Sequence, residues 1–202
     1  MIRTERVEIE GVPLLATLLP GNGVGLLALH GSNEGGTAEL AEQVARRCRA
    51  TSLVFTQPGA RRPVHIPSPL MAVDHCALLR EFLDAVSLTV SLHGHRRPHA
   101  PRSLFLGGRN REAAQVLAGE LLALAPRFRA VTDLEEVPAA LRGLHPRNPV
   151  NLTRLGGVQV ELPLLARTTG PADTPPQPVV DALAAGVLRL AQSPATSTQE
   201  PS

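Results

Sequence analysis

Residues 23–48, GVGLLALHGSNEGGTAELAEQVARRC, contain the junction that decides the fold. The run GVGLLAL is short, continuously apolar and bounded by glycines, which is typical of a strand buried on both faces in a helix-covered sheet. That strand is expected to end at His30. After the turn SNEGG, Thr37 is a suitable N-cap for an amphipathic helix that runs to about Cys48. A buried strand, a polar turn and a helix in this order predict an α/β unit.

The alternation of strands and helices continues on both sides of this junction. Further strands are predicted at residues 6–9, 13–19, 52–56, 88–92, 103–106, near 130 and 157–162, and further helices at 72–86, 110–124, 138–142 and 179–192. The first two strands read as a hairpin, and the segment 163–178, PLLARTTGPADTPPQP, is too rich in proline for regular structure. Alternating strands and helices imply an α/β fold with a largely parallel sheet between helical layers.

The size and composition fit one soluble domain. The chain has 202 residues, of which 43% are hydrophobic and 19% charged, a balance outside the ranges of disordered and membrane proteins. We interpret residues 1–192 as a single domain and residues 193–202 as a disordered tail. No apolar run approaches the ~20 residues of a membrane-spanning helix, and the charged N-terminal segment is unlike a signal peptide. The cytoplasm is the default expectation, and release by lysis would need no signal.

Nucleic acid is not an expected partner. Arginine supplies all 20 basic residues, but 18 acidic residues leave a formal net charge of only +2, which does not suggest a nucleic-acid-binding surface. Four Phe make up the aromatic set, whereas RNA-binding proteins use aromatic stacking platforms. Cys48 and Cys76 lack C-x-x-C spacing, which argues against a thiolate metal site or a disulfide framework.

Histidine and glutamate side chains occur where apolar strands end, the part of an α/β sheet where active sites gather. His30 and Glu34 follow one predicted strand, His93 follows another, and Glu161 lies within the last. A single histidine in such a place is more often a capping or loop residue. Two imidazoles and a carboxylate, however, form the usual protein ligands of a hydrolytic zinc site, and a further carboxylate such as Glu161 can accept and deliver the proton.

Several segments carry a resemblance to a known family. LALHGSNEGGTAELAEQVA, residues 27–45, resembles the first motif of the poly-γ-glutamate hydrolase family, relatives of the zinc carboxypeptidases. Later blocks follow in family order over roughly residues 25–167, namely HIPSP (65–69), VSLHGH (90–95), LFLGGRNREAAQVL (104–117), NPVN (148–151) and GVQVELPLLAR (157–167). The resemblance implies a zinc-carboxypeptidase-like three-layer α/β/α sandwich with a mixed, largely parallel sheet.

By position, the resemblance implies that His30, Glu34 and His93 bind Zn²⁺ and that Glu161 is the general base. The family's first motif has one more residue between its His and its Glu than the sequence HGSNE has here. Glu39 is therefore an alternative ligand, although it would also suit the first turn of a helix. His95 could support a ligand or be an alternative ligand, but its place beside Arg96 and Arg97 favours a solvated loop residue. The remaining histidines are interpreted as structural or solvated: His65, His75, His99 and His145.

A γ-glutamyl polymer carries one α-carboxylate per residue, so its hydrolase needs cations beside the metal. Arginine suits this purpose because its planar fork binds a carboxylate through two hydrogen bonds. The candidates are Arg109 and Arg111 at a predicted helix start, followed by Arg96, Arg97 and Arg167, with Asn148 and Asn151 as hydrogen-bond donors. A solvated arginine-rich surface and ordinary loop asparagines are the alternative interpretations.

We therefore expect a monomeric, zinc-dependent amidohydrolase that cleaves γ-glutamyl amide bonds in poly-γ-glutamate or a related acidic peptide. One alternative keeps the zinc site and changes the substrate to another small acidic amide, as in a deacylase or peptidase. Another is a catalytically degenerate domain that binds anions, suggested by the shortened spacing between His30 and Glu34. Neither nucleic acid nor a membrane is an expected partner.

Overall fold

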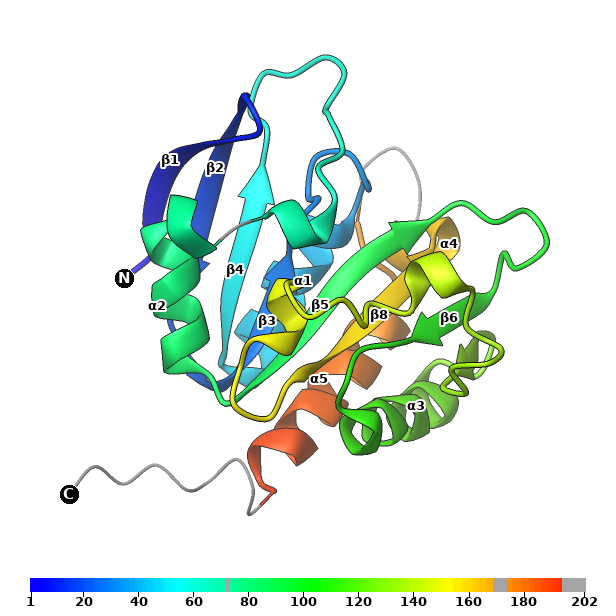
Figure 1. The fold of residues 1–202 in the computed structure, drawn as a ribbon. Helices are drawn as coiled ribbons and strands as arrows, with labels where there is room; N and C mark the ends of the chain where they lie inside the picture. Colours follow the sequence, from blue (N-terminus) through cyan, green and yellow to red (C-terminus); the bar gives the residue numbers. More distant parts are fainter. Residues whose placement is uncertain (72, 169–173, 194–202) are drawn as a thin grey trace.

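The apolar run before His30 forms a strand near the middle of an eight-stranded sheet (Figure 1). The computed structural model describes residues 1–71, 73–168 and 174–193. The strands are β1 (Arg3–Ile9), β2 (Val12–Leu19), β3 (Asn22–Ala28), β4 (Ala50–Thr56), β5 (Leu88–His95), β6 (Ser103–Leu106), β7 (Arg129–Val131) and β8 (Gly157–Pro163). The helices are α1 (Thr37–Cys48), α2 (Ala77–Ala85), α3 (Arg111–Leu124), α4 (Leu164–Arg167) and α5 (Gln177–Ala191).

The sheet is mixed, with a parallel centre. Its strand order is β1-β2-β4-β3-β5-β8-β6-β7. The four central strands β4, β3, β5 and β8 run parallel to one another, whereas β1 with β2, β2 with β4 and β6 with β8 are antiparallel. Parallel central strands place the carboxyl ends of β3, β5 and β8 at one edge of the sheet. The last strand, β8, is inserted between β5 and β6.

Helices cover both faces of this sheet, which makes the predicted α/β/α arrangement. The first face packs against α1, α3 and α5 and forms the larger apolar core, with side chains such as Leu26, Val90 and Val160 fully buried. On the other face, α2 packs over the β1 to β4 side through Leu79 and Phe82. None of the helices in the described ranges is both long and apolar enough to span a bilayer.

Some local predictions differ from the structure. Gly36, with φ 83°, precedes the first turn of α1 in place of the expected Thr37 cap, because glycine adopts this left-handed conformation without strain. The predicted helix at 72–86 begins at Ala77 after a short 3₁₀ turn, and the predicted helix at 138–142 is a 3₁₀ turn at Ala139–Leu141. Within the supposedly irregular 163–178 segment, residues 164–167 form α4. Apart from Ser193, the predicted tail lies outside the described residues.

Candidate metal centre

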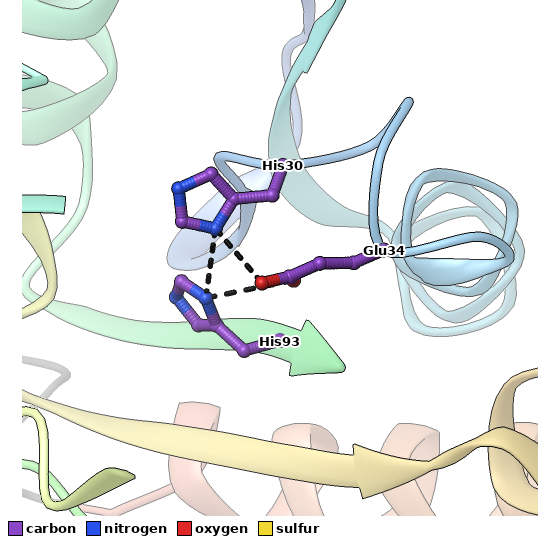
Figure 2. Close-up of side chains that lie close together, drawn as sticks. All are labelled: His30, Glu34 and His93. Carbon is purple, nitrogen blue, oxygen red and sulfur yellow. Dashed lines mark hydrogen bonds and ion pairs between the residues drawn. The ribbon is translucent and has the colours of Figure 1, made fainter. Parts of the chain in front are cut away.

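The two strand ends that carry histidine lie next to each other in the sheet. His30 follows β3, His93 lies near the end of β5, and these strands are parallel neighbours. Glu34 comes from the turn between β3 and α1, which returns toward both imidazoles (Figure 2). Topology therefore brings together three side chains that are up to 63 residues apart in the sequence.

The three side chains converge on one point. Nδ1 of His30 lies 3.2 Å from Nδ1 of His93 and 3.1 Å from Oε1 of Glu34, and Nδ1 of His93 lies 3.6 Å from Oε2 of Glu34. One candidate ligand atom from each residue falls within 4.8 Å of the others. Both histidines are buried and the Glu34 side chain is 11% exposed. Two nitrogens and one carboxylate at this spacing could hold a metal ion.

The far nitrogens of both imidazoles are occupied by hydrogen bonds. Nε2 of His30 lies 2.7 Å from the carbonyl oxygen of Ile66, and Nε2 of His93 lies 2.9 Å from the hydroxyl of Ser91. Because a carbonyl only accepts hydrogen bonds, His30 carries a proton on Nε2, and Nδ1 is the nitrogen that faces the cluster. Such a partner on the far nitrogen is what fixes the orientation of metal-binding histidines.

The electrostatics of the cluster also favour a cation. Burial alone would raise the pKa of Glu34, but hydrogen bonds and charge from His30 and His93 outweigh it and hold this pKa well below its usual range. Burial likewise opposes protonation of His93, yet Glu34 and Glu161 raise the pKa of that imidazole. In the absence of an ion, the two carboxylates therefore favour the protonated, positively charged form of His93. A bound metal ion would supply positive charge in place of that proton.

Glu161 lies across from His93, with which it is paired in the register of β5 and β8. Its side chain is buried and accepts a hydrogen bond of 2.9 Å from Nε2 of Gln159. Burial raises the pKa of Glu161 to about 7, and the nearby charge of Glu34 adds to this effect. A carboxyl group with a pKa near neutrality is suited to proton transfer.

A cavity of about 640 Å³ opens over the cluster. His30, Glu34, His93 and Glu161 all line it, together with side chains and backbone of three loops. His65 is also in its wall, with its ring centroid 4.3 Å from that of His30. The four residues predicted to bind metal or act as base therefore face one hollow. Their chemical roles stay predictions.

The predicted substrate-binding residues divide into two groups. Arg167 and Asn148 line the cavity, as does Arg96 from the secondary list. Arg167 is almost fully buried, and its guanidinium donates hydrogen bonds to the backbone oxygens of Leu162, Gly35 and His95. Its hydrogen bond to the Gly35 carbonyl connects the turn that carries Glu34 with the segment that follows β8.

Arg109, Arg111 and Asn151 are not among the residues that line the cavity. The Arg111 guanidinium donates hydrogen bonds to three backbone carbonyls, which occupies it in fixing the start of α3. Asn151 binds the carbonyls of Gly143 and His145 and accepts from the backbone N–H of Arg109. It therefore shapes the loop that forms one cavity wall.

Glu39, the alternative metal ligand, is exposed on the first turn of α1 and is not part of the cluster that contains Glu34.

Two histidines differ from their expected settings. His95 is buried at the end of β5, and its Nε2 lies 2.9 Å from the carbonyl of Ser103, so it is not a solvated loop residue. His65, interpreted as structural or solvated, lies beside His30 at the candidate metal centre. Sequence periodicity could not place it there, because it belongs to an irregular loop. The HIPSP block was the available signal, since its isoleucine supplies the carbonyl that holds His30.

Gln57 is a further residue that the sequence did not single out. Its side-chain amide donates to the carbonyl of Val64 at 2.6 Å and accepts from the Val64 N–H at 2.8 Å. Its backbone N–H donates to the hydroxyl of Ser32 at 2.7 Å. Gln57 thus joins the loop behind His30 to the turn that leads to Glu34.

Comparisons with known proteins agree with this arrangement. The family model described as poly-gamma-glutamate hydrolase matches residues 16–169. A bacteriophage poly-gamma-glutamate hydrolase structure has a TM-score of 0.69 at 21% identity, covering 90% of this chain and 89% of that one. A structure named YNDL-apo and described as zinc-free has a TM-score of 0.69 at 22% identity, with coverage of 89% and 90%.

A more distant neighbour extends the fold relationship. A protein named as a carboxypeptidase, from Burkholderia mallei, has a TM-score of 0.51 at 13% identity, covering 93% of this chain and 61% of that one. No protein of curated function matches the chain in sequence. The structural likenesses establish a carboxypeptidase-like α/β fold, as the sequence predicted.

Proposed function

Because the chain belongs to the poly-γ-glutamate hydrolase family, we propose that it is a zinc-dependent amidohydrolase that cleaves γ-glutamyl amide bonds. The observation that carries the proposal is the convergence of His30, Glu34 and His93 at the floor of a cavity that Glu161 also lines. The family supports hydrolysis as the reaction. The donor set supports zinc, and the charges of the cavity wall support an acidic substrate.

The residues of the cluster fit a zinc ion. Two imidazole nitrogens and a carboxylate are typical catalytic zinc ligands, and they leave a position for water or substrate. Bound there, Zn²⁺ would polarise the scissile carbonyl and bring the pKa of a water molecule to about 7. The chain's own contribution is to hold the ligands. Ile66 and Ser91 fix the two imidazoles, while the Gly94 N–H donates to Oε2 of Glu34 at 2.9 Å.

Glu161 is the proposed proton carrier. As a carboxylate it accepts a proton from the attacking water, and it then donates this proton to the nitrogen of the leaving amine. Its hydrogen bond from Gln159 fixes the side chain on the cavity side of β8. Asn148 in turn donates to Oε1 of Gln159 at 2.9 Å, so two buried amides support the orientation of the base.

The cavity wall is suited to an anionic substrate. Its acidic side chains are Glu34 and Glu161, and both have proposed chemical tasks. Its other charged lining includes Arg96, an exposed guanidinium that can bind an α-carboxylate of a γ-glutamyl chain. Arg167 adds positive charge to the wall, although backbone carbonyls already accept its hydrogen bonds. A neutral peptide would gain little from these guanidinium groups, whereas every residue of a γ-glutamyl polymer presents a carboxylate.

Metal analysis combined with a substrate assay tests the proposal. Wild-type protein should contain about one zinc per chain and shorten poly-γ-glutamate. His30→Ala and His93→Ala should lose both properties, whereas His75→Ala, an exposed histidine outside the cavity lining, should keep them. Glu161→Gln should keep zinc and lose about 10²- to 10⁴-fold in kcat.

Other outcomes would redirect the assignment. Bound zinc with no cleavage of the polymer, but with cleavage of a small acidic amide, would favour the deacylase alternative. Unchanged metal content in both histidine variants would contradict the metal site and favour a degenerate anion-binding domain. Circular dichroism of each variant shows whether the fold persists.

A further inference from the structure

A second cavity of about 300 Å³ is lined by the turn after β5 and by the start of helix α4, and it shares Arg96 with the first cavity. Figure 1 shows the position of these two segments at the end of the sheet. Arg96 lines both cavities, and Arg97 lines the second alone. His95 fixes this turn, because its Nδ1 accepts from the Arg97 N–H at 3.3 Å while its Nε2 donates to Ser103. The two hollows therefore share a wall that carries a guanidinium group.

Apart from His95, the other side chains that line the second cavity are apolar. Its walls come from prolines on both sides and from Leu164 and Leu165 at the start of α4. These two leucines are 46% and 51% exposed, so their side chains are accessible to a ligand. The second cavity thus offers an apolar surface bordered by two arginines. This combination suits a ligand with methylene groups and a negative charge.

Arg96 and Arg97 have no acidic partner within the described part of the chain. Arginines elsewhere do pair with acids, as Arg47 does with Asp181 and Arg129 with Glu136. The sequence also contains no Asp or Glu from residue 85 to 111, nor from 137 to 160. The turn after β5 and the loop that precedes β8 therefore carry basic but no acidic side chains, and this excess of positive charge attracts anions.

We propose that the second cavity binds a further γ-glutamyl unit of the polymer, one that lies beyond the unit held in the first cavity, over the candidate metal centre. Each γ-glutamyl unit places two methylenes in its backbone and one carboxylate on its branch. The methylenes lie against the proline and leucine walls, and the carboxylate binds Arg97. This inference rests on the proposed function and defines its substrate as a chain of several residues, not a single amide.

Chain length is the variable that tests this subsite. Wild-type kcat/KM is measured on γ-glutamyl oligomers from two residues to about eight, and it should rise once an oligomer is long enough to enter both cavities. Arg97→Gln should remove most of that rise. At the longest oligomer its kcat/KM should be about ten-fold below that of the wild type, the usual size of the effect when a charged hydrogen bond is lost. Arg102→Gln is the matched control, since this exposed arginine follows in the same loop but lines neither cavity.

A binding experiment separates failure of the subsite from failure of the proposed function. Affinity of the Glu161→Gln protein for an eight-residue γ-glutamyl oligomer is measured by calorimetry, with and without Arg97→Gln. A ten-fold weaker Kd in the double variant supports the subsite even if the wild type cleaves nothing, in which case the proposed function alone is wrong. Equal affinities, or a wild-type kcat/KM that does not depend on chain length, would overturn the subsite while leaving hydrolysis intact.

Discussion

Alternate residues of β5 and β8 face two different environments, and both environments are buried. On one side they pack into the main apolar core against helices, with Val90, Leu92, Val158, Val160 and Leu162 all 0% exposed. On the other side the buried residues are polar, namely Thr89, Ser91, His93, Gln159 and Glu161. Burial is the same on the two sides, so polarity alone separates the face that stabilises the fold from the face that holds the proposed site residues.

The polar face is tolerated because most of its groups have partners. Ser91 contacts His93, Gln159 contacts both Asn148 and Glu161, and His93 contacts the cluster around Glu34. A buried polar group without a partner costs about 1–3 kcal/mol. Substitutions on the apolar face should therefore change stability, whereas substitutions on the polar face should change metal binding and protonation.

The largest effect on stability is expected from Leu92→Ala on the apolar face. Removal of this buried side chain should lower the free energy of unfolding by about 2–5 kcal/mol, because it leaves a hole in the core. Urea unfolding measures the loss. Zinc content of the folded variant should be unchanged, since the side chain points away from the cluster; loss of zinc from folded protein would contradict the separation of the faces.

The pH dependence of stability should distinguish Glu161 from an ordinary carboxyl group. Its pKa of about 7 in the folded protein exceeds the ordinary 4.5 of an unfolded chain. Between these values the folded state holds a proton that the unfolded state has released, so this residue makes the protein less stable as pH rises.

Glu161→Gln removes that dependence. The metal-free variant should gain about 2 kcal/mol in unfolding free energy relative to wild type between pH 5 and pH 8. Denaturant titrations of both proteins in a chelator at the two pH values measure the difference. If the unfolding free energies of the two proteins changed equally between pH 5 and pH 8, Glu161 would titrate at its ordinary pKa.

The smallest effect is expected from Ser91→Ala, which removes the partner of Nε2 of His93. Zinc Kd should rise about ten-fold, as for other losses of a hydrogen bond behind a metal-binding histidine. Thr89→Val is the control, because Thr89 lies on the same face and its hydroxyl has no hydrogen-bond partner among the described residues. This control should leave zinc affinity as it is; an equal weakening in both variants would show that the effect does not pass through His93.

The spacing of apolar residues predicted helices and strands well where that spacing reflects burial against the sheet. The helices beginning at Thr37 and Arg111 and the strand at residues 103–106 agree with the sequence reading, because their apolar spacing reflects packing on the sheet. His30, Glu34, His93 and Glu161 could be proposed as site residues because they follow or lie within apolar strands.

The remaining parts of the site depend on contacts between distant loops. Nothing in the periodicity of residues 57–71 indicates that Gln57 fixes Val64, or that Ile66 holds His30. Arg111 shows the opposite case. Its place at a helix start suggested an anion site, but three backbone carbonyls occupy its guanidinium. The hydrogen-bond partners of such side chains depend on the tertiary structure, about which short-range sequence patterns carry no information.

The insertion of β8 between β5 and β6 also sets an order of events during synthesis. His30, Glu34 and His93 leave the ribosome well before Glu161, and β6 cannot join β5 except through the strand that carries this glutamate. Closing contacts between segments so far apart in the chain is the slow part of folding. The emerging protein therefore gains the proposed metal ligands first and the proposed base last, so that the candidate site is complete only when the sheet is complete.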